Sequence, residues 1–267
     1  MTFYEKYSEA AKKGTTKVCV GLDPDIEKLP GHLPKTIDGT KSFLFDIIDA
    51  TADLACAYKP NFAFFGALGQ EGFALLAQVI KHVDGRAPVI LDFKAGDIGN
   101  TAEKYAVMAY DVFGADAVTI NPYMGQDAVE PFLRGQEKCV FLLCLTSNPG
   151  SQDFQRLSTD DGRLFEVVAR TAVEWSKEGA CGLVVGATHP EDLPRVRALA
   201  PDLPFLIPGV GSQGGDPSSI VDQAASSDGL GILINASRSI LYASSDEGFA
   251  DAARQAAEEM RKSIEGS

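Results

Sequence analysis

The sequence has 267 residues, of which 45% are hydrophobic and 23% are charged, enough apolar material for one sizeable core. Its 37 acidic residues outnumber 24 basic ones and give a formal net charge of −13, which argues against a nucleic-acid partner because phosphate backbones require a basic surface. No apolar run approaches the roughly 20 residues of a membrane span, and residues 1–14 carry Glu and Lys in place of an apolar signal core, so we expect a cytoplasmic protein with no membrane partner.

Apolar periodicity predicts alternating strands and helices along the whole chain. A short amphipathic helix is expected first, over residues 3–13. Strands are expected over residues 17–22, 55–58, 88–93, 116–120, 139–145, 181–185, 204–207 and 231–234. Helices are expected over residues 40–54, 68–83, 100–113, 125–134, 163–178, 190–199, 216–224 and 246–264, with a long polar loop over 146–161. About eight strand-helix units without a linker predict an α/β fold in which residues 1–267 form a single (β/α)8 TIM barrel domain with a short N-terminal helix.

The stretch from Leu91 to Thr101 places charges inside an otherwise buried strand. Asp92 and Lys94 share one face of a regular strand, because side chains alternate with a period of two residues. Asp97 follows in a turn flanked by glycines, and Asn100 with Glu103 resembles a capping box that opens the next helix. The stretch therefore offers two carboxylates and an ammonium group at the carboxyl end of a strand, although an ion pair without function would give the same pattern.

A (β/α)8 barrel gathers its functional groups at the carboxyl ends of the strands. Asp23 ends the first predicted strand, and Lys59 follows the second at a proline-containing turn. Glycine-rich residues 208–215 follow the seventh strand, and Arg238 lies just after the eighth. Because backbone amides in such loops can bind an anion and Arg adds a bidentate charge, these two loops predict a phosphate site.

The cysteines and histidines do not form a recognisable site. The five cysteines are Cys19, Cys56, Cys139, Cys144 and Cys181. They contain no C-x-x-C pair, so buried reduced thiols are favoured over a metal site or a disulfide framework. The three histidines are scattered along the sequence and indicate neither a His-rich metal site nor a Ser-His-Asp arrangement.

Several of these features together resemble the orotidine 5′-phosphate decarboxylase family. They are Lys59 at the end of the second strand, Asp92-x-Lys94-x-x-Asp97-Ile98, Pro208-Gly-Val-Gly-x-Gln213-Gly-Gly-Asp216, and Arg238. The resemblance covers almost the whole barrel and is strongest to the longer-chain bacterial branch of the family. It implies decarboxylation of orotidine 5′-phosphate to uridine 5′-phosphate, the last step of de novo pyrimidine nucleotide synthesis, without a metal or an organic cofactor.

The resemblance also implies roles for the charged residues. Lys59, Asp92, Lys94 and Asp97 would form an alternating catalytic network, in which Asp97 comes from the second subunit of a homodimer with shared active sites. Lys94 would protonate C6 of the pyrimidine as carbon dioxide leaves. The implied substrate-binding residues are Asp23, Ile98, Thr101, Ser147, Pro208, Gln213, Gly214 and Arg238. One departure is Ser237, where glycine is expected before the arginine.

Within this scheme the binding residues divide by the part of the nucleotide that they contact. Asp23 and Lys59 would hold the ribose hydroxyls, with Thr101 reaching across from the partner subunit. Ser147 and the backbone near Pro208 would contact the pyrimidine ring. The 5′-phosphate would be held by Gln213, Arg238 and the backbone amide of Gly214.

Two other functions compete with this interpretation. A sugar-phosphate aldolase or epimerase can share the Asp-x-Lys-x-x-Asp motif, but the aldolases need carboxylates placed for Mg²⁺. A catalytically silent nucleotide-binding barrel would keep the phosphate loops and could lose the charged network. Lys59 and the loop that contains Gln213 favour the decarboxylase, and metal dependence would distinguish it from an aldolase.

Overall fold

An eight-stranded parallel sheet forms the centre of the computed structural model, which describes residues 1–188, 190–210, 217–227 and 229–265. The strands are β1 (Val18–Leu22), β2 (Ala57–Pro60), β3 (Ile90–Ala95), β4 (Ala117–Ile120), β5 (Gly135–Leu145), β8 (Gly179–Val185), β9 (Phe205–Pro208) and β10 (Ile232–Ala236). Their order around the sheet follows their order in the chain, and each pairs in parallel with its neighbour. Isolated parallel bridges between Tyr58 and Val89 and between Asn61 and Asp92 join β2 to β3. These bridges close the sheet into a barrel.

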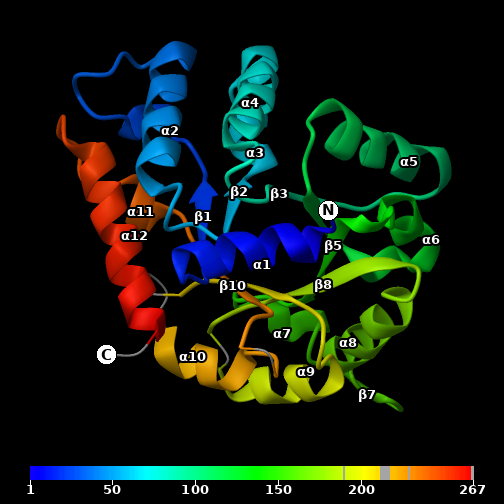
Figure 1. Cartoon of the computed structure of the whole chain (residues 1–267). Coiled ribbons are helices and arrows are strands. Elements are labelled where there is room, and N and C mark those ends of the chain that lie inside the picture. Colours follow the sequence, from blue (N-terminus) through cyan, green and yellow to red (C-terminus); the bar gives the residue numbers. More distant parts are fainter. Residues whose placement is uncertain (189, 211–216, 228, 266–267) are drawn as a thin grey trace.

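Helices between the strands surround this barrel (Figure 1). The longer ones are α1 (Phe3–Gly14), α2 (Ile37–Thr51), α4 (Gly69–Val83), α5 (Gly99–Val107), α8 (Leu164–Trp175), α9 (Leu193–Leu199), α10 (Pro217–Ala224) and α12 (Phe249–Glu265). Short helices are α3 (Phe62–Gly66), α6 (Gln126–Val129), α7 (Ser151–Phe154) and α11 (Arg238–Leu241). The predicted (β/α)8 barrel with an N-terminal helix is confirmed.

Several segments differ from their predicted secondary structure. The helix expected over 125–134 ends at Val129 and gives way to a 3-10 turn, because Pro131 cannot donate a helical hydrogen bond. The polar loop expected over 146–161 contains α7 and one strand of a small hairpin, formed by β6 (Ser158–Thr159) and β7 (Gly162–Arg163). The helix expected over 100–113 is α5 followed by a π-helical turn, Met108–Val112.

Helix α1 closes the amino-terminal end of the barrel, and Figure 1 shows it lying across that opening. Its start is fixed by a capping box, in which Thr2 Oγ1 accepts from Glu5 N and the Glu5 carboxylate accepts from Thr2 N. Its apolar face buries Phe3 and Tyr7 against Phe141 and other barrel-interior side chains. The Tyr7 hydroxyl donates to the carbonyl of Ile232 at 2.8 Å. The part of the barrel interior that lies against α1 is therefore a packed core.

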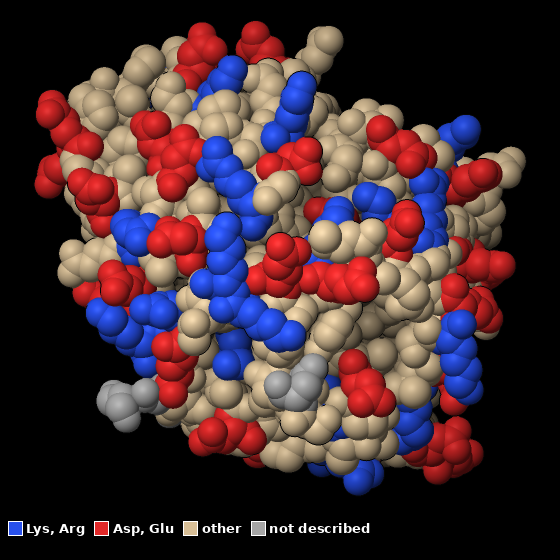
Figure 2. All heavy atoms as spheres, in the orientation of Figure 1, with Lys and Arg blue, Asp and Glu red and all other residues tan. Residues whose placement is uncertain are grey.

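Acidic and basic side chains are interspersed over the face that carries α1, as Figure 2 shows. Among the described residues, no helix is both long enough and apolar enough to cross a bilayer.

Candidate active site

The carboxyl end of β3 departs from regular strand geometry where the charged motif lies. In the pairing with β4, Leu91 lies opposite Val118 and Ala95 lies opposite Ile120. Three residues, Asp92 to Lys94, therefore face the single residue Thr119, which defines a β-bulge. Lys94 takes a left-handed conformation with φ of 49°, which is uncommon for a residue other than glycine. The regular strand assumed for this stretch is thus wrong in detail, because the bulge turns the backbone before Lys94.

The side chains of Lys59, Asp92 and Lys94 nevertheless meet above the packed core. Lys59 Nζ lies 2.7 Å from Asp92 Oδ2, and the Lys94 ammonium forms an ion pair with Asp92 Oδ1. Thr119 Oγ1 donates to the same Oδ1 atom at 3.0 Å. The Lys59 and Asp92 side chains are 5% and 9% exposed, whereas that of Lys94 is 48% exposed. One carboxylate is therefore held between a buried cation and a cation that solvent can reach.

Burial and charge act in opposite directions on this cluster. Burial by itself would lower the pKa of Lys59, but the carboxylates of Asp92 and Asp23 outweigh it and raise that pKa well above its ordinary value. Burial would likewise raise the pKa of Asp92, and the Lys59 and Lys94 cations outweigh it and hold that pKa well below its ordinary value. Lys59 and Asp92 thus remain charged across the physiological range.

A cavity of about 210 Å³ lies beside this cluster at the carboxyl ends of the strands. The predicted residues that line it are Asp23, Lys59, Asp92, Pro208 and Arg238. Asn61, Asn235 and Ser237 also line it, although they are not among the predicted site residues. Uncharged Asn and Ser residues are common in loops and do not by themselves indicate a site. The only feature of the sequence that could have indicated these three residues is their position at or just after the end of a strand.

Two polar atoms at this cavity have no hydrogen-bond partner in the described structure. They are Oδ1 of Asp23 and Oδ1 of Asn235, and both are buried. Asn235 is 8% exposed, and its amide nitrogen is 3.5 Å from Ser237 Oγ. Because an unsatisfied buried acceptor is costly, a ligand that offers hydroxyl donors suits this side of the cavity.

Ser237 is accommodated by the strand that it packs against. A side chain at Gly21 would bring its Cβ to 1.9 Å from Ser237 Oγ, so a glycine is required on β1 at this point. The departure from glycine at position 237 is therefore matched by a glycine on the neighbouring strand β1, and Arg238 still begins α11 at the cavity.

Four of the predicted site residues lie away from this cavity within the chain. The carboxylate of Asp97 accepts from the backbone N–H of Ile98 at 2.8 Å, and among the described residues no Lys or Arg lies within ion-pair distance of it. Ile98 and Thr101 are exposed, the former by 53%. Ser147 packs against Gly186, and its carbonyl accepts from the Thr188 hydroxyl at 3.1 Å.

Two further predicted residues, Gln213 and Gly214, lie outside the described residues. The capping box predicted at Asn100 and Glu103 is wrong. Helix α5 begins at Gly99 and its N-cap is Ile98, which makes no side-chain capping bond.

Comparison with known proteins relates this chain to one family. The sequence profile of the family described as Orotidine 5'-phosphate decarboxylase / HUMPS matches residues 16–253. The chain is 48% identical over 266 residues to an orotidine 5'-phosphate decarboxylase from Janthinobacterium sp. (strain Marseille), covering 99% of this chain and 98% of that one. It is 50% identical over 269 residues to the enzyme of that name from Aromatoleum aromaticum, with the same coverage. The chain belongs to the orotidine 5′-phosphate decarboxylase family.

Solved structures agree with this family assignment. The Leishmania donovani OMP decarboxylase superimposes with a TM-score of 0.86 at 41% identity and covers all of both chains. A Toxoplasma gondii protein described as a putative orotidine-monophosphate-decarboxylase superimposes with a TM-score of 0.88 at 38% identity and covers 99% of each chain. Membership of the decarboxylase family does not favour the magnesium-dependent aldolase or the silent barrel.

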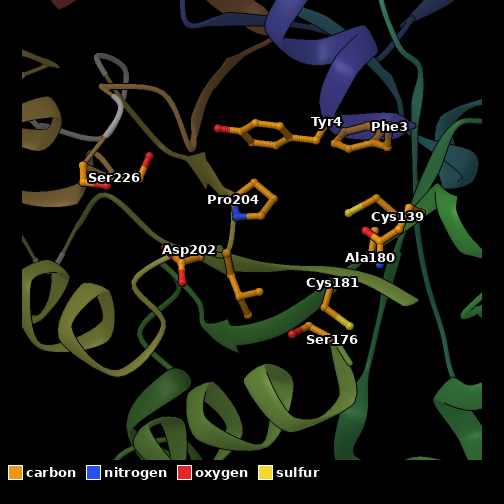
Figure 3. A pocket seen from close by; sticks show the side chains of 12 residues that line it. Phe3, Tyr4, Cys139, Ser176, Ala180, Cys181, Asp202, Pro204 and Ser226 are labelled. Atoms are coloured by element: carbon orange, nitrogen blue, oxygen red, sulfur yellow. The ribbon is translucent and has the colours of Figure 1, made fainter. Parts of the chain in front are cut away.

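A second hollow, of about 400 Å³, lies at the amino-terminal end of the barrel beside Phe3 and Tyr4 of α1 (Figure 3). Burial raises the pKa of the Cys181 thiol to about 12 and that of Cys139 well above its ordinary value, so both stay protonated near neutral pH. Among the described residues that line it there is no Lys or Arg. This hollow therefore lacks the paired cations that flank Asp92, and the cavity at the carboxyl ends of the strands is the candidate active site.

Proposed function

We propose that the protein decarboxylates orotidine 5′-phosphate to uridine 5′-phosphate in pyrimidine nucleotide synthesis, in the cavity beside Lys59, Asp92 and Lys94. The observation that carries the proposal is the Asp92 carboxylate between two lysine cations, in a chain of the orotidine 5′-phosphate decarboxylase family. Five free, buried cysteines support a reducing compartment, and we place the enzyme in the cytoplasm.

The reaction breaks the bond between C6 and the carboxylate carbon, and the electron pair of that bond stays on C6 as carbon dioxide leaves. A cation near C6 stabilises this developing negative charge, and in our proposal that cation is Lys94. Lys94 Nζ then gives a proton to C6, which completes uridine 5′-phosphate. Because the Lys94 side chain is 48% exposed, it can recover a proton from solvent after each turnover.

Asp92 has two roles in this scheme. It orients both lysines through its two oxygen atoms, Oδ2 toward Lys59 and Oδ1 toward Lys94. Its charge also repels the carboxylate of the bound substrate, and that repulsion disappears when carbon dioxide leaves. The low pKa of Asp92 keeps it negative for both roles.

The rest of the nucleotide would be bound by groups that the cavity presents. The open acceptors on Asp23 and Asn235 suit the ribose hydroxyls, together with the Lys59 ammonium. Arg238 would hold the 5′-phosphate with Gln213 and the backbone amide of Gly214, and Ser147 and Pro208 would contact the pyrimidine ring.

A second copy of the chain completes the site in this proposal. Asp97, Ile98 and Thr101 lie in the segment after β3, where Ile98 is 53% exposed and Tyr123, after β4, is 81% exposed. Exposed apolar side chains after two paired strands suit burial against a partner. We propose that the partner subunit's Asp97 reaches the Lys94 ammonium in a homodimer.

The experiment that tests the function is turnover of orotidine 5′-phosphate by metal-stripped protein in excess chelator, followed by loss of the orotate chromophore. We expect full activity without metal. Absence of turnover, together with cleavage of a sugar phosphate after Mg²⁺ is restored, would instead support the aldolase and remove the roles given to Ser147 and Asp97.

A further inference from the structure

We propose that Thr119 on β4 is a positioning residue for the decarboxylation, because its hydroxyl fixes both the Asp92 carboxylate and the backbone of Lys94. The inference rests on the proposed function of the Lys59, Asp92 and Lys94 cluster. Thr119 is 1% exposed and is not among the residues that line the cavity, so it acts through its neighbours and not on the substrate.

Every hydrogen-bonding position of the Thr119 hydroxyl is occupied. Its oxygen accepts from the backbone N–H of Phe93 at 2.9 Å and from that of Lys94 at 3.0 Å. A hydroxyl oxygen has two lone pairs and one proton, so the remaining interaction is the donation to Asp92 Oδ1 at 3.0 Å. The two backbone donors therefore fix the direction of the proton, and the carboxylate has a donor aimed at one defined oxygen.

The same hydroxyl supports the bulge that sets the direction of Lys94. Three residues of β3 face Thr119 alone, so the backbone N–H groups of Phe93 and Lys94 bond to its side chain in place of a ladder carbonyl. The backbone of Lys94 has a φ of 49°, a conformation that costs energy unless its surroundings impose it. Thr119 imposes it from the neighbouring strand and thereby brings the Lys94 ammonium back over Asp92.

Removing the Thr119 hydroxyl should lower the catalytic rate without weakening substrate binding. In Thr119→Val, which keeps the shape of the side chain, the two N–H groups and Asp92 Oδ1 each lose a partner. We expect kcat to fall by about 10²-fold, the size of effect that misplacing a reacting group by about 1 Å produces. We expect KM to stay near its wild-type value, because Arg238 and the other cavity residues are unchanged. Thr119→Ser restores the hydroxyl and should restore most of kcat.

The matched control is Thr40→Val on α2, which also removes a buried hydroxyl hydrogen bond, donated to the carbonyl of Thr36 at 2.9 Å. Its kcat should equal that of the wild type. Circular dichroism checks the folding of each variant, and if Thr119→Val does not fold, Thr119→Ala is measured in its place with the same expected loss of kcat. Wild-type-like kcat in a folded Thr119→Val or Thr119→Ala protein, or a fall in Thr119→Ser as large as in Thr119→Val, would overturn the inference. Failure of the wild type to turn over orotidine 5′-phosphate would instead refute the proposed function.

Discussion

The Nζ atom of Lys59 lies 2.7 Å from Oδ2 of Asp92, and less than a tenth of either side chain is exposed. The two residues come from adjacent strands at the point where an isolated bridge between Asn61 and Asp92 closes the barrel. The charge pair therefore lies at the junction between β2 and β3, and its integrity affects both the fold and the site.

Replacing Asp92 should destabilise the protein as well as inactivate it. In Asp92→Asn the buried Lys59 cation loses the carboxylate with which it forms its ion pair, and removing one partner of a buried pair typically costs about 3–5 kcal/mol of unfolding free energy. Urea unfolding measures this loss. The control is Glu27→Gln, which breaks a pair with Lys35 in which both side chains are at least half exposed, and which should change stability by less than about 1 kcal/mol. Equal stability of the two variants would contradict an energetically important buried pair.

The same pair predicts how stability depends on pH. The pKa of Asp92 is lowered in the folded protein, so its contribution is present above the unfolded value of about 3.9 and is lost as pH falls through the folded pKa. The pKa of Lys59 is raised, so its contribution is present below the unfolded value of about 10.4 and is lost as pH rises through the folded pKa. The pair should therefore stabilise the protein uniformly between about pH 4 and about pH 10.

Urea unfolding at several pH values checks this expectation. Stability should decrease below about pH 4 more steeply in the wild type than in Asp92→Asn, since the variant has no carboxylate to protonate. Glu27→Gln should follow the wild-type profile. If the unfolding free energy of the wild type and that of Asp92→Asn decrease equally at acid pH, protonation of Asp92 is not the cause of the decrease.

Lys94→Ala should abolish most of the turnover and leave much of the nucleotide binding. Removing a positioned proton donor costs about 10²- to 10⁴-fold in rate, and here the cation that stabilises charge at C6 is lost with it. We expect at least that loss in kcat, with binding of uridine 5′-phosphate still measurable by calorimetry because Arg238 is intact. Lys104→Ala removes an exposed lysine of α5 and should keep wild-type kinetics. A rate near that of the wild type in Lys94→Ala would exclude Lys94 as the proton donor.

The barrel could be predicted from the sequence because the hydrophobic patterns that indicate its strands and helices are local. Each strand and each helix carries its own periodicity, and Lys59, Asp92 and Lys94 stand next to strand ends where a barrel gathers them. The bulge at Asp92 to Lys94 could not be predicted, since it depends on how Thr119 pairs from the next strand. Asn235 was missed for a similar reason, because only the closed barrel shows that its side-chain oxygen is buried at the cavity without a partner.

The shared active site can be tested by mixing two inactive variants. Lys94→Ala and Asp97→Ala proteins are mixed and re-equilibrated, so that random exchange makes half of the dimers mixed. If Asp97 acts across the interface, each mixed dimer has one complete site, and about a quarter of the wild-type activity should return. The control mixes Lys94→Ala with Asp92→Asn, whose altered residues act in the same chain, and should regain none. No recovery in the first mixture, with mixed dimers demonstrated by mass spectrometry, would place Asp97 outside a shared site, because the intact Asp97 of the Lys94→Ala chain should then complete the site that holds the intact Lys94 of the Asp97→Ala chain.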